Sequence, residues 1–224
     1  MSALACVAVT SNLRLLAETV AAALEGCGLP VVRVPWPRHE QGAPPAENLA
    51  EIGPDVALLV VEPGDEGEIC AVRELLLGYN GRSLVMADAR PGPLWGAILE
   101  AGADAVVGST TTLDEVVEGI DLLARGETLM GVVERQVLLR QWLAARADQQ
   151  ALRAKIELLT PREREVLQLL HEGASAAAVA ERFGVSQTTV RSQIRAVLAK
   201  LEVRSQLAAV AVLESVLTGQ SNDC

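Results

Sequence analysis

Residues 159–210 read LTPREREVLQLLHEGASAAAVAERFGVSQTTVRSQIRAVLAKLEVRSQLAAV, and this stretch predicts helices separated by short turns. The first helix begins with a capping box, because Thr160 suits the N-cap, Pro161 the first helical position and Glu163 the third. Gly173 ends this helix. Its apolar residues recur at helical spacing: Val166, Leu167, Leu169 and Leu170.

A third helix, capped by Ser186, follows a short helix at about 176–182 and a tight turn at 183–185. Its apolar residues recur on one face: Val190, Ile194, Val197, Leu198 and Leu201. A second face is polar and basic: Thr188, Arg191, Ser192 and Arg195. Guanidinium groups beside hydroxyls suit phosphates and base edges, because Arg can bind guanine bidentately. The pattern predicts an all-α helix-turn-helix domain, whose second helix enters the major groove.

The same stretch resembles the DNA-binding domain of LuxR/NarL-type transcription regulators. The resemblance rests on LTPREREVL, Ala180, Gly184-Val185-Ser186, Thr189-Val190-Arg191 and Lys200-Leu201. Double-stranded DNA is therefore the expected partner. Arg191, Ser192 and Arg195 are expected to read bases, whereas Gln187, Thr188, Thr189 and Lys200 are expected to hold phosphates. The alternative is a small helical bundle with incidental surface arginines.

The charge of the chain is unevenly distributed. The net charge of −10 alone argues against a nucleic-acid partner. Residues 1–145 hold 9 basic and 20 acidic residues, however, and residues 146–224 hold 10 and 9. Between Arg182 and Arg204 there are five basic residues and one acidic residue. The cationic footprint is therefore local and lies on the expected recognition helix.

Length and composition favour one or two intracellular domains. The chain has 224 residues, of which 50% are apolar. No run of about 18 uncharged apolar residues occurs and no signal peptide is evident, so a cytoplasmic protein without a membrane partner is expected. The four cysteines have no CxxC or metal-ligand spacing, and free thiols are expected. No cofactor and no metal site are predicted.

The N-terminal part alternates apolar runs with helical patterns. Strands are predicted at residues 4–9, 29–34, 55–61, 83–87 and 104–107. Helices are predicted at about 13–24, 67–78, 93–101 and 112–125. This alternation predicts an α/β doubly wound, five-stranded parallel sheet of the flavodoxin-like class. Its functional edge is expected at the carboxyl ends of the strands.

With the C-terminal part, this arrangement resembles a response regulator: a receiver followed by a LuxR/NarL-type output domain. The segment at 101–127, AGADAVVGSTTTLDEVVEGIDLLARGE, resembles the last strand and helix of a receiver, and Pro54-Asp55 lies where the third strand begins. We therefore expect a receiver-like domain at 1–127, a linker helix at 128–155 and a helix-turn-helix domain at 156–224.

The part of the chain that resembles a receiver lacks the residues that phosphorylation requires. A receiver needs acidic residues after the first strand, a nucleophilic aspartate, a Thr or Ser, and a Lys. The corresponding positions here are Thr10, Ser11, Val60, Ala87 and Ser109. Neutral hydroxyls are poor ligands for Mg²⁺, and a valine cannot accept a phosphoryl group. The N-terminal domain is therefore interpreted as a degenerate pseudo-receiver that is regulated without phosphorylation.

Two features of the sheet edge suggest what replaces phosphorylation. Glu62 lies two residues beyond Val60 and is a candidate mimic of a phosphorylated aspartate, although a solvated loop glutamate is the alternative. The proline-rich connection at 35–45 leaves the same edge, and Trp36, Arg38 and His39 are candidates for a lid over a small-molecule ligand. Asp88, near the end of the fourth strand, is a further candidate ligand group. The alternatives are an ordered surface loop at 35–45 and a simple loop residue at Asp88.

Two further helices bear on partners. A linker helix is expected at about 132–154, with Val133, Val137, Leu138, Trp142 and Ala145 close to one face. The last helix, at about 206–217, is apolar nearly all round. One side must cover the output core, which leaves the other for a partner. In the family that this chain resembles, this helix mediates dimerisation.

The sequence favours a DNA-binding transcription regulator that is controlled by ligand, partner or abundance. Either a homodimer or a heterodimer with a related regulator is expected. The alternative is an interaction module that modulates another regulator as its heterodimer partner. An enzyme is not expected, because no glycine-rich phosphate loop follows the first strand and no Ser/His/Asp or Cys/His set is evident.

Overall fold

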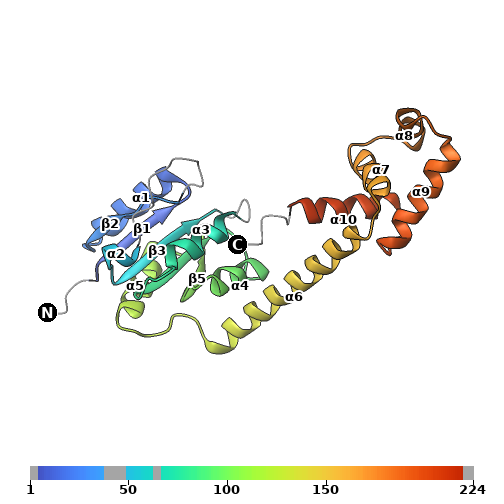
Figure 1. The fold of residues 1–224 in the computed structure, drawn as a ribbon. Coiled ribbons are helices and arrows are strands. Elements are labelled where there is room, and N and C mark those ends of the chain that lie inside the picture. Colours follow the sequence, from blue (N-terminus) through green and yellow to red (C-terminus); the bar gives the residue numbers. More distant parts are fainter. Residues whose placement is uncertain (1–4, 38–48, 63–66, 219–224) are drawn as a thin grey trace. The chain divides into compact units, whose positions relative to one another are not determined.

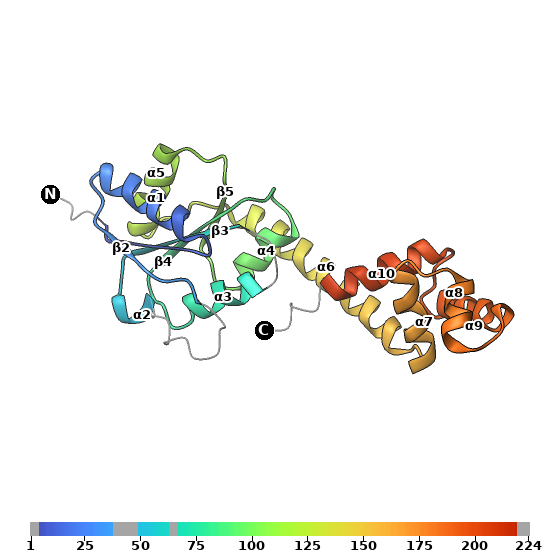
Figure 2. The ribbon, with the colours of Figure 1, turned by 90° about the horizontal axis from the view of Figure 1, so that it is seen from above.

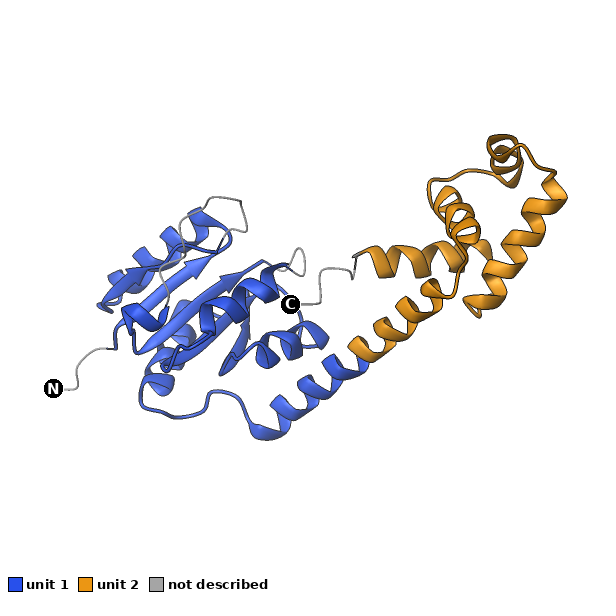
Figure 3. Cartoon of the chain, in the orientation of Figure 1, with its two compact units in different colours: residues 1–144, 224 blue, residues 145–223 orange. Residues whose placement is uncertain are grey.

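The computed structural model describes residues 5–37, 49–62 and 67–218, which form two compact units (Figure 3). Unit 1 extends to Ala144 and unit 2 begins at Ala145. The division falls inside one continuous helix, α6 (Val132–Glu157). This helix covers most of the expected linker at 128–155, and its first half is grouped with unit 1.

Unit 1 is the predicted five-stranded parallel sheet, with strand order β2-β1-β3-β4-β5 (Figure 1). The strands are β1 (Val7–Ser11), β2 (Val31–Arg33), β3 (Val56–Val61), β4 (Arg82–Ala87) and β5 (Ala105–Gly108). Helices α1 (Arg14–Gly26) and α5 (Leu113–Ala124) cover one face, and α2 (Leu49–Ile52), α3 (Gly67–Leu76) and α4 (Pro93–Glu100) cover the other (Figure 2). Every residue of β3 is buried, as expected for a central strand covered on both faces.

The structure changes two details of the predicted elements of unit 1. The first strand begins at Val7 and includes Thr10 and Ser11, so these two residues lie in the strand and are buried. The four-residue α2 has no counterpart among the predicted helices. A single helical turn is too short to show a periodic apolar pattern.

The first half of α6 packs directly on α4. A Cβ atom at Gly96 would lie 2.3 Å from the carbonyl oxygen of Leu138 and 2.6 Å from Cβ of Trp142. Leu138 and Trp142 are buried as expected. The side chains of Val133 and Val137 are 73% and 39% exposed, so these two residues do not pack within unit 1.

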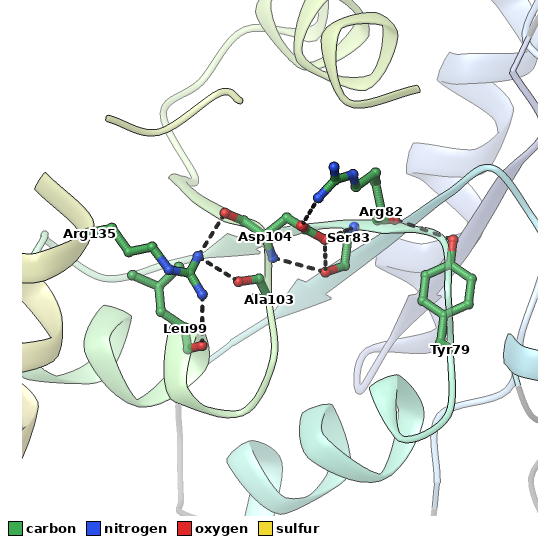
Figure 4. A network of polar contacts seen from close by, with 7 residues as sticks. All are labelled: Tyr79, Arg82, Ser83, Leu99, Ala103, Asp104 and Arg135. Atoms are coloured by element: carbon green, nitrogen blue, oxygen red, sulfur yellow. Dashed lines mark hydrogen bonds and ion pairs between the residues drawn. The ribbon is translucent and has the colours of Figure 1, made fainter. Parts of the chain in front are cut away.

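Arg135 anchors α6 at the end of α4 (Figure 4). Its guanidinium donates to the carbonyl oxygens of Ala103 and Asp104, each at 3.0 Å, and to that of Leu99 at 3.3 Å. The carboxylate of Asp104 accepts from the Ser83 backbone N–H and from Nη1 of Arg82, each at 2.8 Å. The network links α6 to the start of β4 and so makes the first half of α6 part of unit 1.

Tyr79 extends this network toward β3. Its hydroxyl donates to the carbonyl oxygen of Pro54 at 2.9 Å and lies 3.3 Å from that of Arg82. Burial raises the pKa of Tyr79, and the charges of Asp55 and Asp104 act in the same direction. The raised pKa keeps the phenol in its hydrogen-donating form at alkaline pH as well.

Unit 2 contains the end of α6 and four helices: α7 (Pro161–His171), α8 (Ala176–Phe183), α9 (Gln187–Lys200) and α10 (Gln206–Thr218). The predicted capping box is present, since Thr160 accepts from the Glu163 backbone N–H while Glu163 accepts from that of Thr160. Gly173 and Gly184 have positive φ angles of 87° and 65° at the ends of α7 and α8. These local signals produce the helix boundaries close to where the sequence predicts them.

The cysteines differ in their bonding. Cys6 and Cys27 are free thiols, but Cys70 is disulfide-bonded, so the expectation that all four cysteines are free is wrong at Cys70.

In the described part of the chain, no helix combines the length and the apolar character that crossing a membrane requires.

Candidate nucleic-acid interface

The recognition surface is built on α9, which begins at a tight turn after α8. Gly184 takes the left-handed conformation that ends α8. Ser186 then caps α9, because its hydroxyl accepts from the backbone N–H of Thr189 at 3.1 Å. The buried residues Val190, Ile194 and Val197 hold one side of α9 on the core of unit 2. The opposite side is therefore turned to solvent.

The predicted polar face is exposed as a single surface. Thr188, Arg191, Ser192 and Arg195 are all exposed. Gln187 and Thr189 are also exposed in the first turn of the helix. The structure therefore brings six of the seven predicted DNA-binding residues together at the outer face and N-terminal end of α9.

The two arginines of this face have no protein partner in the described part of the chain. Neither Arg191 nor Arg195 forms a hydrogen bond or ion pair there. Arg182 and Arg204 are likewise exposed and make no such contacts with the described residues. The sequence analysis includes them in the local positive charge but does not name them as site residues. Four guanidiniums are thus available to anions on and beside α9.

The hydroxyl groups of the face already make local contacts. Oγ of Ser192 donates to the carbonyl oxygen of Thr188 at 3.1 Å. The hydroxyls of Thr189 and Ser186 are 2.9 Å apart. Each hydroxyl retains capacity for one more hydrogen bond, so these contacts orient the side chains without removing them from the surface.

Lys200, the seventh predicted residue, is placed differently. Its Nζ donates to Oε2 of Glu163 at 2.6 Å and to the carbonyl oxygen of Leu158 at 3.1 Å. It is therefore not a free cation of the exposed face. Sequence spacing does not reveal this contact, because the two charged residues are 37 positions apart.

Arg162 supports the turn that precedes α9. Its guanidinium carbon lies 3.2 Å from the centre of the Phe183 ring, and its Nη1 pairs with Glu165 at 2.9 Å. Phe183 is the last residue of α8. The stacked pair joins the start of α7 to the end of α8. Arg162 is therefore already engaged by protein groups, unlike the exposed arginines of α9.

The positions that the sequence analysis compares with a phosphorylation site lie at the carboxyl edge of the sheet in unit 1. Ser11 is the register partner of Val60, and Ala87 is the partner of Gly108. Val60 is 4% exposed and surrounded by apolar core. Oγ of Ser109 donates to Oδ1 of Asp88 at 2.5 Å. Val60, which the sequence analysis compares with a receiver's nucleophile, therefore lies buried near the end of β3.

Asn12 organises the same edge and was not predicted. Its side chain donates to the carbonyl oxygen of Glu62 and to the carboxylate of Glu68, and it accepts from the Glu62 backbone N–H. A single asparagine after a predicted strand carried no signal of this bridging role. Among the described residues, no group of three or more His, Cys, Asp or Glu side chains could hold a metal ion.

The candidate lid residues are only partly described. Trp36 is half-buried and packs against the core of unit 1. Glu62 is exposed and Asp88 is the acceptor for Ser109. Arg38 and His39 lie outside the described residues. The described members therefore do not converge on one another through any hydrogen bond or ion pair that the structure gives.

The last helix has the two sides that were predicted. Ala209, Leu213 and Val216 are buried against the core of unit 2. Leu207 is 79% exposed and Leu217 is 42% exposed. The apolar surface of α10 is thus only partly used within unit 2.

Two solved structures are similar over nearly the whole chain. The response regulator RcsB in complex with DNA is 19% identical, with a TM-score of 0.43 over 95% of this chain and 99% of that chain. RcsB from Salmonella typhimurium is 18% identical, with a TM-score of 0.46 over 94% and 99% of the two chains.

The chain is also similar in sequence to bacterial regulatory proteins. Residues 157–213 match the sequence model of the family described as bacterial regulatory proteins, luxR family. The nitrate/nitrite response regulator protein NarL of Escherichia coli (strain K12) is 27% identical over 173 residues, 76% of each chain. The response regulator protein VraR of Staphylococcus aureus (strain Mu3) is 31% identical over 113 residues, 50% of each chain. Unit 2 contains a LuxR-family helix-turn-helix domain, and the chain has response regulators among its homologues.

Proposed function

We propose that this LuxR/NarL-type transcription regulator binds specific DNA sequences with α9 in the major groove. The observation that carries the proposal is the outer face of α9, where Arg191 and Arg195 are exposed without a protein partner in the described residues. Arg191, Ser192 and Arg195 would contact base edges. Gln187, Thr188 and Thr189, at the helix N-terminus, would contact phosphates. Such a regulator would act in the cytoplasm, where the DNA is.

The test is a gel-shift titration at fixed salt with a duplex that the wild-type chain selects from a random-sequence library. Replacing Arg191 and Arg195 together by Ala should abolish selective binding. The control replaces Arg90 and Arg140, two exposed arginines of unit 1, and so changes the net charge by the same amount. Unchanged affinity in the Arg191/Arg195 variant would show that α9 is not the recognition helix.

We further propose that unit 1 is not switched by phosphorylation. The support is the buried Val60 at the nucleophile position and the closed Ser109–Asp88 hydrogen bond at the neighbouring strand ends. Control would then come from a ligand, a partner or the abundance of the chain. Incubation with acetyl phosphate and Mg²⁺ should leave the intact mass unchanged. An added phosphoryl mass would contradict this part of the proposal.

The regulator is proposed to act as a dimer through α10. The exposed Leu207 and Leu217 extend an apolar helix whose other side is buried. A heterodimer with a related regulator uses the same surface and is the second candidate. Light scattering after size exclusion, with the chain alone and with a candidate partner, distinguishes the two: the homodimer predicts twice the chain mass for the chain alone.

A small-molecule ligand at the sheet edge of unit 1 is the remaining proposal for its control. The half-buried Trp36 would report on such a ligand, because it packs on the core beside that edge. A thermal-shift screen of metabolites, repeated with Trp36→Ala, tests it. Absence of any stabilised melting temperature would argue against control by the screened compounds.

A further inference from the structure

Both lysines of the chain lie at one junction of unit 2, although the chain has 19 basic residues. Lys155 is in the last turns of α6, and its Nζ lies 2.6 Å from Oε2 of Glu202, just after α9. Lys200 is the last residue of α9, and its Nζ lies 2.6 Å from Oε2 of Glu163, in the first turn of α7. The two ion pairs connect the C-terminal end of α9 to the segment where α6 ends and α7 begins.

Lys200 is held by acceptors from two segments. In addition to Glu163, its ammonium donates to the carbonyl oxygen of Leu158, at the end of α6. The same Oε2 of Glu163 accepts from the backbone N–H of Thr160 at 2.7 Å. Two of the three ammonium protons are therefore already directed at protein oxygens. The capping box of α7 and the end of α9 share one carboxylate.

The carboxylate of this ion pair is mostly buried, whereas the ammonium is partly exposed. The side chain of Glu163 is 12% exposed and that of Lys200 is 35% exposed. The hydrogen bond from Lys200 is the largest cause that lowers the pKa of Glu163 below its ordinary value. Moving Lys200 to a DNA phosphate would leave a mostly buried carboxylate without its counterion, which is unfavourable.

The arginines around α9 face no such conflict. In the described part of the chain, Arg182, Arg191, Arg195 and Arg204 have no ion pair to give up. Beneath the junction, Ile156, Leu159 and Leu201 are buried in one apolar cluster. The junction thus combines a packed apolar core with two ion pairs. Together these contacts fix the orientation of the C-terminal end of α9 relative to α6 and α7.

We propose that Lys200 is a positioning residue for DNA recognition rather than a phosphate contact. It holds the C-terminal end of α9 against the end of α6 and the start of α7, so that Arg191 and Arg195 enter the groove at a set angle. The inference rests on the proposed function, because it assigns a role within that DNA-binding surface.

The test compares Lys200→Met, Glu163→Gln and the double variant in the full chain. The DNA probes are the duplex selected by the wild-type chain and a scrambled duplex of equal length and composition. Glu163→Gln keeps the capping acceptor and removes the charge. Each single variant should bind the selected duplex about tenfold more weakly with an unchanged salt slope, and the double variant should be no more than about threefold weaker than either.

A phosphate contact predicts the opposite pattern. Lys200→Met would then weaken both duplexes equally and reduce the salt slope by about one. Glu163→Gln would bind as tightly as the wild type or more tightly, because it releases Lys200. Either result overturns the proposal, as would an equal loss in Lys155→Met, whose partner Glu202 is 71% exposed. Failure of the wild-type chain to select any duplex would instead overturn the proposed function.

A spectroscopic measurement on the unmodified sequence guards against variants that do not fold. With ¹⁵N-labelled lysine, the chain gives only two side-chain ammonium signals, and Lys155→Met assigns them. The Lys200 signal should keep its chemical shift when the selected duplex is added, because its partner remains Glu163. A large shift of this signal on DNA binding overturns the positioning role.

Discussion

Gly96 of α4 contacts the backbone of Leu138 in α6 so closely that a Cβ atom would lie 2.3 Å from the Leu138 carbonyl oxygen. Real Cβ atoms do not approach a backbone atom to that distance. The absent side chain is therefore what allows the two helices to meet. This contact and the hydrogen bonds of Arg135 together hold the first half of α6 in unit 1.

Gly96→Ala should destabilise unit 1 by about 1–3 kcal/mol, because the added methyl group forces backbone movement in a packed interface. Urea unfolding followed by tryptophan fluorescence measures it, since all three tryptophans are in unit 1. The control is Gly26→Ala, at the end of α1, where nothing lies within 4 Å of the added Cβ. Equal effects of the two substitutions would contradict the close contact.

Arg135→Met should also lower the unfolding free energy of unit 1. The substitution removes a cation that donates to three carbonyl oxygens, one in the last turn of α4 and two in the connection to β5. A loss of about 1–3 kcal/mol is expected for hydrogen bonds to a charged group. Arg140→Met, on the exposed side of the same helix, is the control and should change little. If Arg135→Met left the unfolding free energy unchanged, the contacts of Gly96 and Trp142 alone would hold α6.

The stability of unit 2 should depend on the charge of Glu163. Its folded pKa is lowered, so its contribution is fully present above the unfolded value of about 4.3 and is lost as the pH falls through the lowered folded value. The wild type should therefore exceed Glu163→Gln in melting temperature at pH 7, and the gap should narrow below about pH 4.3. Thermal melts followed by circular dichroism measure both; a gap that widens in acid would refute the lowered pKa.

Leu207→Gln should weaken dimer formation without unfolding unit 2. Leu207 is 79% exposed, so its loss removes little packing within the chain. The neutral side chain also avoids repulsion from DNA. Light scattering should report a larger monomer fraction, with an unchanged melting temperature. Leu15→Gln, at a residue 77% exposed on α1, is the matched control and should leave the mass unchanged.

Arg191→Ala and Arg204→Ala should change DNA binding in different ways. Loss of a base contact at Arg191 should cost about 1–3 kcal/mol and relax the preference for one base pair. Arg204 is exposed just beyond α9 and is expected to contact phosphate, so its loss should weaken binding to all sequences similarly and reduce the salt slope by about one. Selection of preferred duplexes by each variant at fixed salt provides the comparison. Identical preferences for the two variants would contradict the assignment of Arg191.

The helices and caps of unit 2 could be predicted from the sequence because their signals are local. The capping box of Thr160 and Glu163 joins residues three positions apart, and Gly184 acts on its own backbone. The apolar stripe of α9 likewise repeats within one helix, so its exposed face follows from the spacing. The same reasoning located Val60 at the end of a buried strand.

The packed face of α6 could not be predicted in this way. Val133 and Val137 are apolar but exposed, whereas Arg135 is charged and packs on unit 1. The face was decided by Gly96, which admits the backbone of α6, and by carbonyl oxygens in and just after α4 that accept from the Arg135 guanidinium. Neither partner is visible from the periodicity of α6 itself.

The two basic residues Arg191 and Lys200 show where local and tertiary information divide. Both lie in α9, and the sequence places both near a DNA-binding surface. Spacing within the helix is enough to expose Arg191, because its neighbours at i+3 and i−1 define the buried side. The role of Lys200 depends on Glu163, 37 positions earlier, and on Leu158 at the end of α6. Long-range electrostatic pairing is decided only when the chain has folded, since it requires charges that are distant in sequence to be shielded from water together.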